Sequence, residues 1–205
     1  MSTTMKILSG LFFQNNLFTG KILFVYLCLS PILLLGADLI FHSEHLEFEI
    51  FPERCEVTGY YTFRNDNRDP LQQTLIYPFP VQETLPFPAS LSVTDSSGIP
   101  IAYERGANEI IFPVIVPGES CSTYKVCYTQ PTPEHFIEYI LNTTMRWHFP
   151  LTSAEFIIIA PSDIQIESIS MSDYKVSREN DKTKYRIFRE NFSTDKNLII
   201  KWSLK

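Results

Sequence analysis

The sequence begins with a long apolar stretch and then changes to short runs in which apolar and polar residues alternate. Its first 37 residues contain no Asp or Glu, and the apolar run Ile22 to Ala37 directly follows Lys21. Acidic residues begin at Asp38. A basic flank, an apolar run and a small-residue end are the three parts of a secretory signal. We therefore interpret residues 1–37 as a signal peptide or a membrane anchor.

The apolar run leaves cleavage and retention both open. Its 16 residues exceed most signal-peptide cores but fall short of the roughly 20 residues that a spanning helix usually needs. Leu35 makes a mediocre cleavage context, and Pro31 would kink a spanning helix. In both cases the lysines remain inside, so the chain from Asp38 onward is expected outside the cytoplasm. It would be secreted, periplasmic or membrane-anchored, with residues 22–37 contacting the membrane if they are not cleaved.

Alternation with a period of two predicts β-strands beyond this segment. It is clear in Leu46–Ile50 and in Cys55–Phe63, where Cys55, Val57, Gly59, Tyr61 and Phe63 share one face. Further strands are predicted over Gln73–Tyr77, Ala89–Thr94, Ile99–Glu104, Glu109–Ile115, Ser122–Thr129, Phe136–Phe149, Ala154–Ala160, Ile164–Met171, Tyr174–Ser177, Lys184–Arg189 and Leu198–Leu204. Short strands separated by turn residues predict an all-β antiparallel sandwich, one large or two closely packed small ones, after an N-terminal hydrophobic helix.

The segment Gln130-Pro-Thr-Pro-Glu134 is the best internal boundary, because it is polar and holds two prolines. It divides the β region into a first unit over 38–130 and a second over 131–205. We expect the second unit to pack on the first or to complete it.

Composition and charge narrow the classes of partner. Hydrophobic residues make up 44% of the chain, which is ample for a packed core. Beyond Ala37 there are 15 basic residues (17 minus Lys6 and Lys21) and 23 acidic ones, a net charge of about −8. Nucleic acids and anionic membrane surfaces call for concentrated Lys and Arg. The sequence therefore argues against both as ligands.

Several motifs resemble those of inter-alpha-trypsin-type and vault-protein-type β domains. They are Gly59-Tyr-Tyr-Thr-Phe-Arg-Asn65 followed by Pro70-Leu71, then Tyr77-Pro-Phe-Pro80 and Tyr124-Lys-Val-Cys-Tyr128. Some uncharacterised exported bacterial β proteins are similar in the same way, including the ending Asn191-Phe192 to Leu198. In the larger architecture a metal-binding adhesion domain follows the β domain. Here Asp95-Ser-Ser-Gly-Ile99 lacks that domain's second serine, so the resemblance implies no adhesion-site metal.

Three cysteines follow the apolar run: Cys55, Cys121 and Cys127. An exported compartment permits disulfides. Cys121 and Cys127 lie six residues apart in one predicted strand, about 20 Å from each other, so they cannot bond unless the strand folds back. Cys55 would have to supply any bridge, with Cys121 or Cys127 as its partner. The alternative is that all three are small buried thiols.

No pattern of residues predicts a catalytic, cofactor-binding or metal site. His42-x-x-His45 offers only two metal ligands, and a solvated stretch beside the membrane segment explains it better. Asn65-Asp-Asn-Arg-Asp69 has oxygen ligands suited to calcium, but Pro70 stands where the loop needs glycine, so we interpret it as a turn. We expect no cofactor.

The most distinctive surface candidate is the proline-rich segment from Tyr77 to Pro88. Its prolines stiffen an extended loop that carries Tyr77, Phe79, Leu85 and Phe87. Rigid aromatic surfaces bind partners at a low entropic cost. This loop is therefore a candidate partner-binding site. The alternative is a structural crossing that seals one end of the sandwich.

Three hypotheses about function follow. The first is a non-enzymatic β module at the cell surface or in the periplasm that binds a protein or an envelope component. The second is a small extracytoplasmic hydrolase or metal-dependent enzyme built from residues distant in sequence, such as His135, His148, Ser120 and Glu119. The third is a structural subunit of an envelope assembly that uses Cys127 or another unpaired thiol for intermolecular bridging.

The N-terminus of the mature protein distinguishes cleavage from retention. A cleaved signal should yield a chain that begins at Asp38 in the exported soluble fraction, whereas a retained anchor should yield an intact N-terminus in the membrane fraction. N-terminal sequencing after cell fractionation measures both. Recovery of the uncleaved chain in the cytosolic fraction would contradict export.

Overall fold

The structure is a computed structural model that describes residues 39–205. The predicted signal or anchor, with its hydrophobic helix, lies outside the described residues. The predicted all-β fold is confirmed, since thirteen strands and one short 3-10 helix account for the regular structure of this part of the chain. Within residues 39–205 no helix has the length and apolar character needed to cross a membrane.

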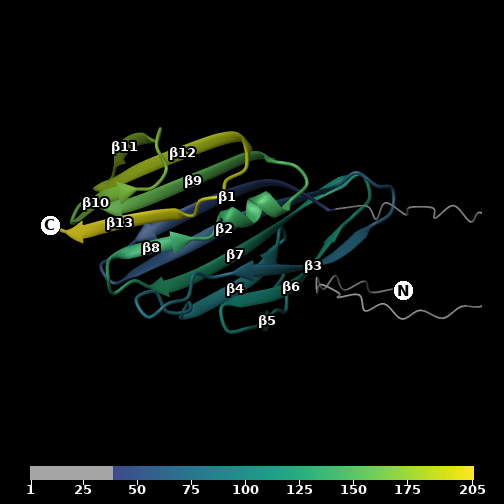
Figure 1. The fold of residues 1–205 in the computed structure, drawn as a ribbon, viewed down its shortest axis with the longest axis horizontal. Coiled ribbons are helices and arrows are strands. Elements are labelled where there is room, and N and C mark those ends of the chain that lie inside the picture. Colours follow the sequence, from purple (N-terminus) through teal and green to yellow (C-terminus); the bar gives the residue numbers. More distant parts are fainter. Residues whose placement is uncertain (1–38) are drawn as a thin grey trace, which may run out of the picture. The chain divides into compact units, whose positions relative to one another are not determined.

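A seven-stranded sheet runs through the whole described region (Figure 1). Its strands are, in spatial order, β11 (Lys175–Glu179), β12 (Lys182–Phe192), β9 (Leu151–Pro161), β1 (Ile40–Ile50), β2 (Arg54–Asn65), β7 (Ser120–Pro131) and β4 (Ser90–Asp95). Three of these strands come from beyond Gln130 and four from before it. The second predicted unit therefore contributes to the same sheet as the first.

Two three-stranded sheets cover one face of the large sheet. The first consists of β10 (Ile164–Ile169), β13 (Leu198–Leu204) and β8 (Phe136–Tyr139), and the second of β3 (Leu71–Pro78), β6 (Glu109–Val116) and β5 (Glu104–Arg105). Ring contacts join the layers, with Phe48 of β1 against Tyr139 of β8 at 5.7 Å. In the second small sheet, the ring of Phe112 in β6 lies 6.5 Å from that of Tyr124 in β7. We call this covered side the inner face and the opposite side the outer face.

The pairing departs from the antiparallel prediction at one place, because β1 and β9 are parallel. Strand β8 and the 3-10 helix η1 (Asn142–Arg146) lie between β7 and β9 in the chain. Parallel neighbours need such a crossover connection. It returns the chain to the end of the sheet where β1 begins, so β9 starts beside Ser43 and runs alongside β1.

Period-two alternation places the core as expected. In β1, Leu46, Phe48 and Ile50 are fully buried, while Glu47 and Glu49 lie on the other face. β1 nevertheless begins at Ile40, six residues before the predicted strand. The expectation of a solvated stretch around His42 and His45 was therefore wrong. A β-bulge at His42, between Phe41 and Ser43, interrupts the alternation there.

Two other predicted strands are shorter in the structure. Of the predicted strand Ile99–Glu104, only Glu104 is in β5. Pro100 lacks the N–H group that a strand ladder needs. In addition, the Asp95 carboxylate accepts hydrogen bonds from the backbone N–H groups of Ser97 and Ile99, which holds a tight turn there. The predicted strand Phe136–Phe149 ends at Tyr139 and continues into η1.

A buried amide ties two turns together at the end of β2. Asn65 is fully buried, and its Nδ2 donates to the carbonyls of Asp69, Val116 and Pro117 at 2.9–3.1 Å. Its Oδ1 accepts from the backbone and side-chain N–H of Asn67, both at 2.9 Å. The segment forms the predicted turn, and the amide of Asn65 organises it.

Replacing this amide should destabilise the fold. In Asn65→Ala the freed carbonyls and amide groups lose their partner, so we expect the free energy of unfolding to fall by about 3 kcal/mol. Urea denaturation checks this. Asp66→Ala, at an exposed position beside it, is the matched control and should change stability by less than about 0.5 kcal/mol. Equal effects of the two substitutions would contradict the role given to Asn65.

Candidate functional site

The proline-rich loop faces inward. Phe79 and Leu85 are 2% and 0% exposed, and the rings of Tyr77 and Phe87 lie 5.2 Å and 5.0 Å from that of Phe79. Phe79 also makes an edge contact with Tyr128 at 5.2 Å. The four side chains that made this loop a candidate partner-binding site therefore pack against the core. The alternative of a structural crossing agrees with this placement.

The three cysteines following the apolar run are free thiols, so no bridge from Cys55 is formed. The register explains this: Cys55 pairs with Gln130, three residues from Cys127 and nine from Cys121. The odd offset places Cys127 on the outer face, while Cys55 is buried on the inner one. Burial, with the nearby charges of Glu56 and Glu49, raises the pKa of Cys55 well above its usual value, so its thiol stays protonated. Cys121 is the exposed thiol of the three.

The residues of the hydrolase hypothesis are not brought together. Glu119 and Ser120 stand at the start of β7, and His135 follows the far end of that twelve-residue strand. The strand itself holds Ser120 and Pro131, its last residue, about 36 Å apart. The His135 ring instead lies 6.3 Å from that of Trp202. Among residues 39–205 no group of three His, Cys, Asp or Glu side chains could hold a metal ion.

One residue from each of the three sheets meets in a buried cluster that we call the tyrosine junction. The Tyr61 hydroxyl, from β2, lies 2.7 Å from that of Tyr77 in β3 and 2.8 Å from that of Tyr139 in β8. Tyr77 donates to Tyr139 at 3.3 Å. Burial raises the pKa of all three hydroxyls well above the usual value, so they remain neutral and can donate.

Gly59 makes room for the junction. The ring of Tyr61 folds back along β2 and occupies the space that a Cβ at position 59 would fill. A glycine inside a strand usually weakens it, because its backbone loses more conformational freedom on folding than that of other residues and it has no side chain to pack. Here the missing side chain allows the Tyr61 hydroxyl to reach the other two sheets.

Glu44 lies beside this junction and was missed by the sequence reasoning. It pairs with Tyr61 in the register of β1 and β2, is 5% exposed, and its Oε1 has no hydrogen-bond partner. Desolvation raises the pKa of Glu44 from 4.5 to about 8. The carboxyl is therefore mostly protonated at neutral pH. Its even spacing from Leu46 and Phe48 is the signal that could have placed it on the inner face.

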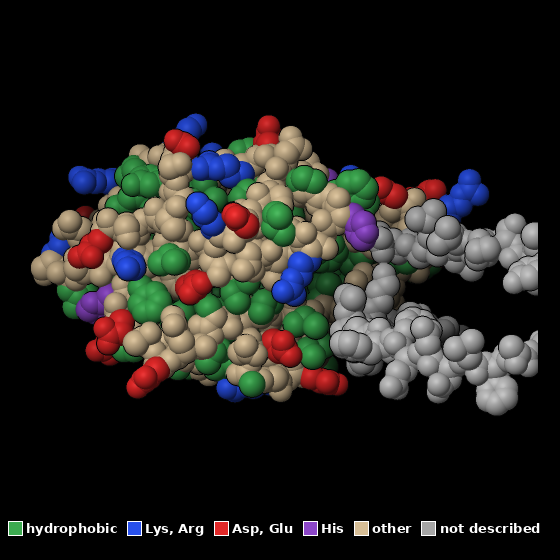
Figure 2. Space-filling view, in the orientation of Figure 1, with side chains coloured by type: hydrophobic (Ala, Val, Ile, Leu, Met, Phe, Trp, Pro, Cys, Tyr) green, Lys and Arg blue, Asp and Glu red, His purple; other side chains and the backbone are tan. Residues whose placement is uncertain are grey.

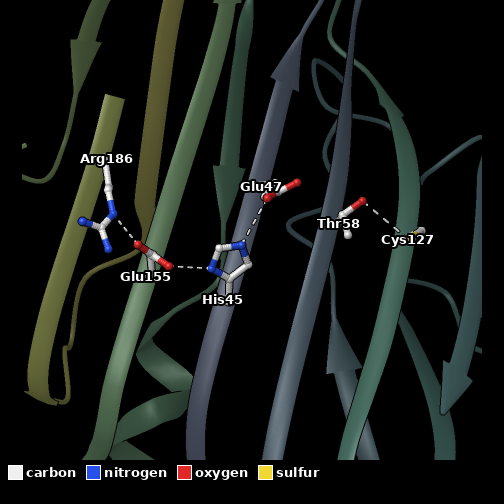
Figure 3. Close-up of polar contacts among 6 residues, drawn as sticks. All are labelled: His45, Glu47, Thr58, Cys127, Glu155 and Arg186. Atoms are coloured by element: carbon white, nitrogen blue, oxygen red, sulfur yellow. Dashed lines mark hydrogen bonds and ion pairs between the residues drawn. The ribbon is translucent and has the colours of Figure 1, made fainter. Parts of the chain in front are cut away.

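The outer face carries a row of contacts across five strands, and Figure 3 shows the part of it formed by Arg186, Glu155 and His45. Arg186 of β12 contacts Glu155 of β9, and the Glu155 Oε2 lies 2.8 Å from Nδ1 of His45 in β1. The His45 ring lies 5.8 Å from that of Tyr60 in β2, which in turn lies 5.5 Å from Nζ of Lys125 in β7. We call these five residues the outer row.

The row is held in place by charge and by register. Partial burial alone would raise the pKa of Glu155, but hydrogen bonds from Arg186 and His45 outweigh it and lower that pKa. Glu155 is therefore ionised at neutral pH. His45 also contacts Glu47 at 3.2 Å through Nε2, and Lys182 contacts Glu49 at 2.6 Å. Such contacts order the side chains of an otherwise open sheet face.

A hollow of about 400 Å³ opens beside β8, β10 and β13 and is lined by Glu138, Asn197, Ser170 and Lys196, among others. Its polar groups already serve the fold. The Asn197 amide donates to Glu138 at 2.6 Å and accepts from the backbone of Leu141, and the Ser170 hydroxyl bonds the backbone of Asn197 and Ile199. We therefore assign this hollow a structural role.

The charged side chains on the side of the two small sheets do not form a patch of one sign. Acidic and basic side chains are scattered over that face without a cluster of one sign (Figure 2). This distribution offers no concentrated patch to a highly charged ligand.

Comparison with known proteins informs the fold alone. No protein-family model and no curated protein matches the sequence. Among solved structures, a candidate nutrient-binding protein from Legionella pneumophila is similar with a TM-score of 0.66 and 12% identity, over 80% of this chain and 66% of that one. An M1 zinc metallopeptidase from Deinococcus radiodurans is similar with a TM-score of 0.50 and 12% identity, over 80% of this chain and 42% of that one.

The chain thus spans less than two thirds of each of these two proteins. Identity this low shows a shared β architecture and carries no activity with it. Neither is an inter-alpha-trypsin-type or vault-type β domain, so the resemblance suggested by the sequence motifs gains no support from them.

The Glu44 carboxyl should make stability depend on pH. The folded state holds this proton more tightly than the unfolded chain, so stability is fully present below pH 4.5 and falls as pH rises through about 8. The loss over this window is roughly 5 kcal/mol. Glu44→Gln removes the titrating proton, and we expect it to match the wild type near pH 4.5 and to be several kcal/mol more stable than it at pH 8.5.

Urea denaturation at pH 4.5, 7 and 8.5 measures the effect. Glu47→Gln, at a half-exposed position on the other face of the same strand, is the matched control and should keep the pH dependence of the wild type. If the Glu44→Gln profile ran parallel to that of the wild type, Glu44 would not be the group responsible.

Proposed function

We propose that this chain is a non-enzymatic β module displayed outside the cytoplasm and that the outer face of its large sheet binds another protein. The observation that carries the proposal is the outer row. Five side chains from five strands are ordered by mutual contacts on the face opposite the two small sheets: Arg186, Glu155, His45, Tyr60 and Lys125.

An ordered pattern of charge is suited to recognising a partner. Complementary charges across an interface determine register and exclude wrong partners, more than they add raw affinity. The row places positive Arg186, negative Glu155 and positive Lys125 on one line, with His45 and Tyr60 between them. Because the side chains are already ordered by contacts within the sheet, a partner would lose less entropy in ordering them.

Display outside the cytoplasm rests on the sequence. The acid-free first 37 residues, the lysines before the apolar run and the onset of acidic residues at Asp38 support it. An envelope assembly remains an alternative context for the same face. In such an assembly, exposed Cys121 would be the thiol that forms an intermolecular disulfide. Cys127 is less suited, because it lies half-buried beside Thr58.

Site-specific photo-crosslinking in the native cells tests the proposal. A photoreactive residue at Phe188, which is 46% exposed and pairs with Glu155, should give one adduct of discrete mass. The same residue at Ile76, which is 62% exposed on β3 of a small sheet, is the matched control and should give none.

Charge reversal identifies the row as the determinant. Arg186→Glu should reduce the yield of the Phe188 adduct at least about tenfold, because like charges facing one another cost several kcal/mol. Equal adducts from Phe188 and Ile76, or a Phe188 adduct that survives the reversal, would overturn the proposal.

A further inference from the structure

The end of η1 and the loop that follows it expose apolar side chains at one end of the sheets. Met145 and Phe149 are 61% and 62% exposed, and Trp147 between them is half-buried. Arg146, His148 and Pro150 are also exposed. We call Met145 to Phe149 the apolar tip. A surface cluster of a thioether, an indole and a phenyl ring is unusual in a soluble protein unless it contacts something apolar.

The tip is held outward by its base. The buried Thr144 hydroxyl donates to the carbonyl of Leu141 at 2.8 Å and accepts from the backbone N–H of Thr194 at 3.1 Å. The Trp147 ring packs on Phe41 and Phe63, with centroids at 5.4 Å and 5.8 Å. Because this base is packed and hydrogen-bonded, Met145 and Phe149 cannot fold onto the core without breaking it.

The tip lies beside the place where the chain enters β1. Leu39, Trp147 and Phe149 line one narrow crevice. Asp38 alone separates Leu39 from the predicted apolar run Ile22–Ala37. Two residues span at most about 7 Å. The chain from a retained membrane segment at residues 22–37 would therefore join the described residues at Leu39, which lines the same crevice as the tip.

We propose that Met145, Trp147 and Phe149 insert into the surface of a lipid bilayer and seat this end of the β module on it. The inference rests on the display outside the cytoplasm proposed above, with residues 22–37 retained. Trp and Phe are suited to the interfacial region, where an apolar ring enters the lipid while polar neighbours stay in water.

The charges favour a neutral lipid surface. The chain beyond Ala37 carries a net charge of about −8, which opposes approach to anionic headgroups. At the end of β2, whose Phe63 contacts Trp147, Arg64 pairs with Asp66 and Arg68 with Glu119, so these charges offset one another. Apolar insertion, and not charge, is thus the attraction expected here.

The two tryptophans make the proposal measurable, since no other tryptophan is present in the sequence. Trp147 belongs to the tip, and Trp202 is 3% exposed in β13. The full chain would be reconstituted into phosphatidylcholine vesicles whose acyl chains carry bromine near the headgroup. In Trp202→Phe, which keeps Trp147, fluorescence should fall at least about twofold relative to unbrominated vesicles, since interfacial residues contact the upper acyl chains. In Trp147→Phe, which keeps Trp202, it should not change.

A second variant separates insertion from mere proximity. Met145→Ser/Phe149→Ser in the Trp202→Phe background should lose at least half of the quenching, because two apolar anchors are removed. Both positions are exposed, so the unfolding transition should be nearly unchanged and shows that the fold is kept. Quenching of neither tryptophan, equal quenching of both, or tip-to-tip dimers without quenching would overturn the proposal.

This readout is independent of the function proposed for the outer row. The full chain contains the apolar run whether or not cells remove it, and no protein partner is present in the vesicles. A failed crosslink at Phe188 would leave the expected quenching unchanged, and a failed quenching experiment would leave the crosslink unchanged.

Discussion

Three tyrosine hydroxyls, one from each sheet, determine how the layers of this fold meet. Tyr61, Tyr77 and Tyr139 each find their hydrogen-bond partners in the other two, so none is left unsatisfied in the apolar interior. A buried hydroxyl without a partner would cost the fold 1–3 kcal/mol on the usual order of magnitude. The sheets therefore cannot slide by more than a fraction of a hydrogen-bond length without losing this arrangement.

The tyrosine junction also lies on the face of the large sheet that the two small sheets cover, so the opposite face is the one exposed to solvent. Strand β1 lies at the centre of that sheet, and its neighbouring residues Glu44 and His45 point to opposite faces. Glu44 stands beside the junction, while His45 stands in the outer row. Because the two small sheets pack on the side of the junction, the outer row is left to solvent. One strand thus connects a buried carboxyl group to the candidate binding face.

The sequence predicted those parts of the fold that local pattern controls. Leu46 to Ile50 and Cys55 to Phe63 alternate, and the structure buries the alternating residues as expected. The turn at Asn65 was also predictable, because amide and carboxylate side chains form turns by bonding their own backbone. The parallel pairing of β1 with β9 was not, since it depends on where a crossover returns the chain.

The outer row could not be predicted from the local sequence pattern either, because it too depends on which strands become neighbours. Glu155 meets His45 through the parallel pairing of two strands, across 110 residues of the chain, and Arg186 reaches Glu155 through the pairing of β12 with β9. No spacing along the sequence reveals these pairings. Glu44 was obscured because a carboxylate before an alternating run is usually assigned to solvent. Phe79 and Leu85 looked like a surface because prolines suggest an exposed loop, whereas their side chains turn toward the core.

Gly59 shows how far the needs of the junction extend along the chain. The ring of Tyr61 lies where a side chain at position 59 would be. The residue that position 59 can hold therefore depends on the residue at position 61. A larger residue at 59 is tolerated only if the ring at 61 is given up, and with the ring goes the bond between three sheets.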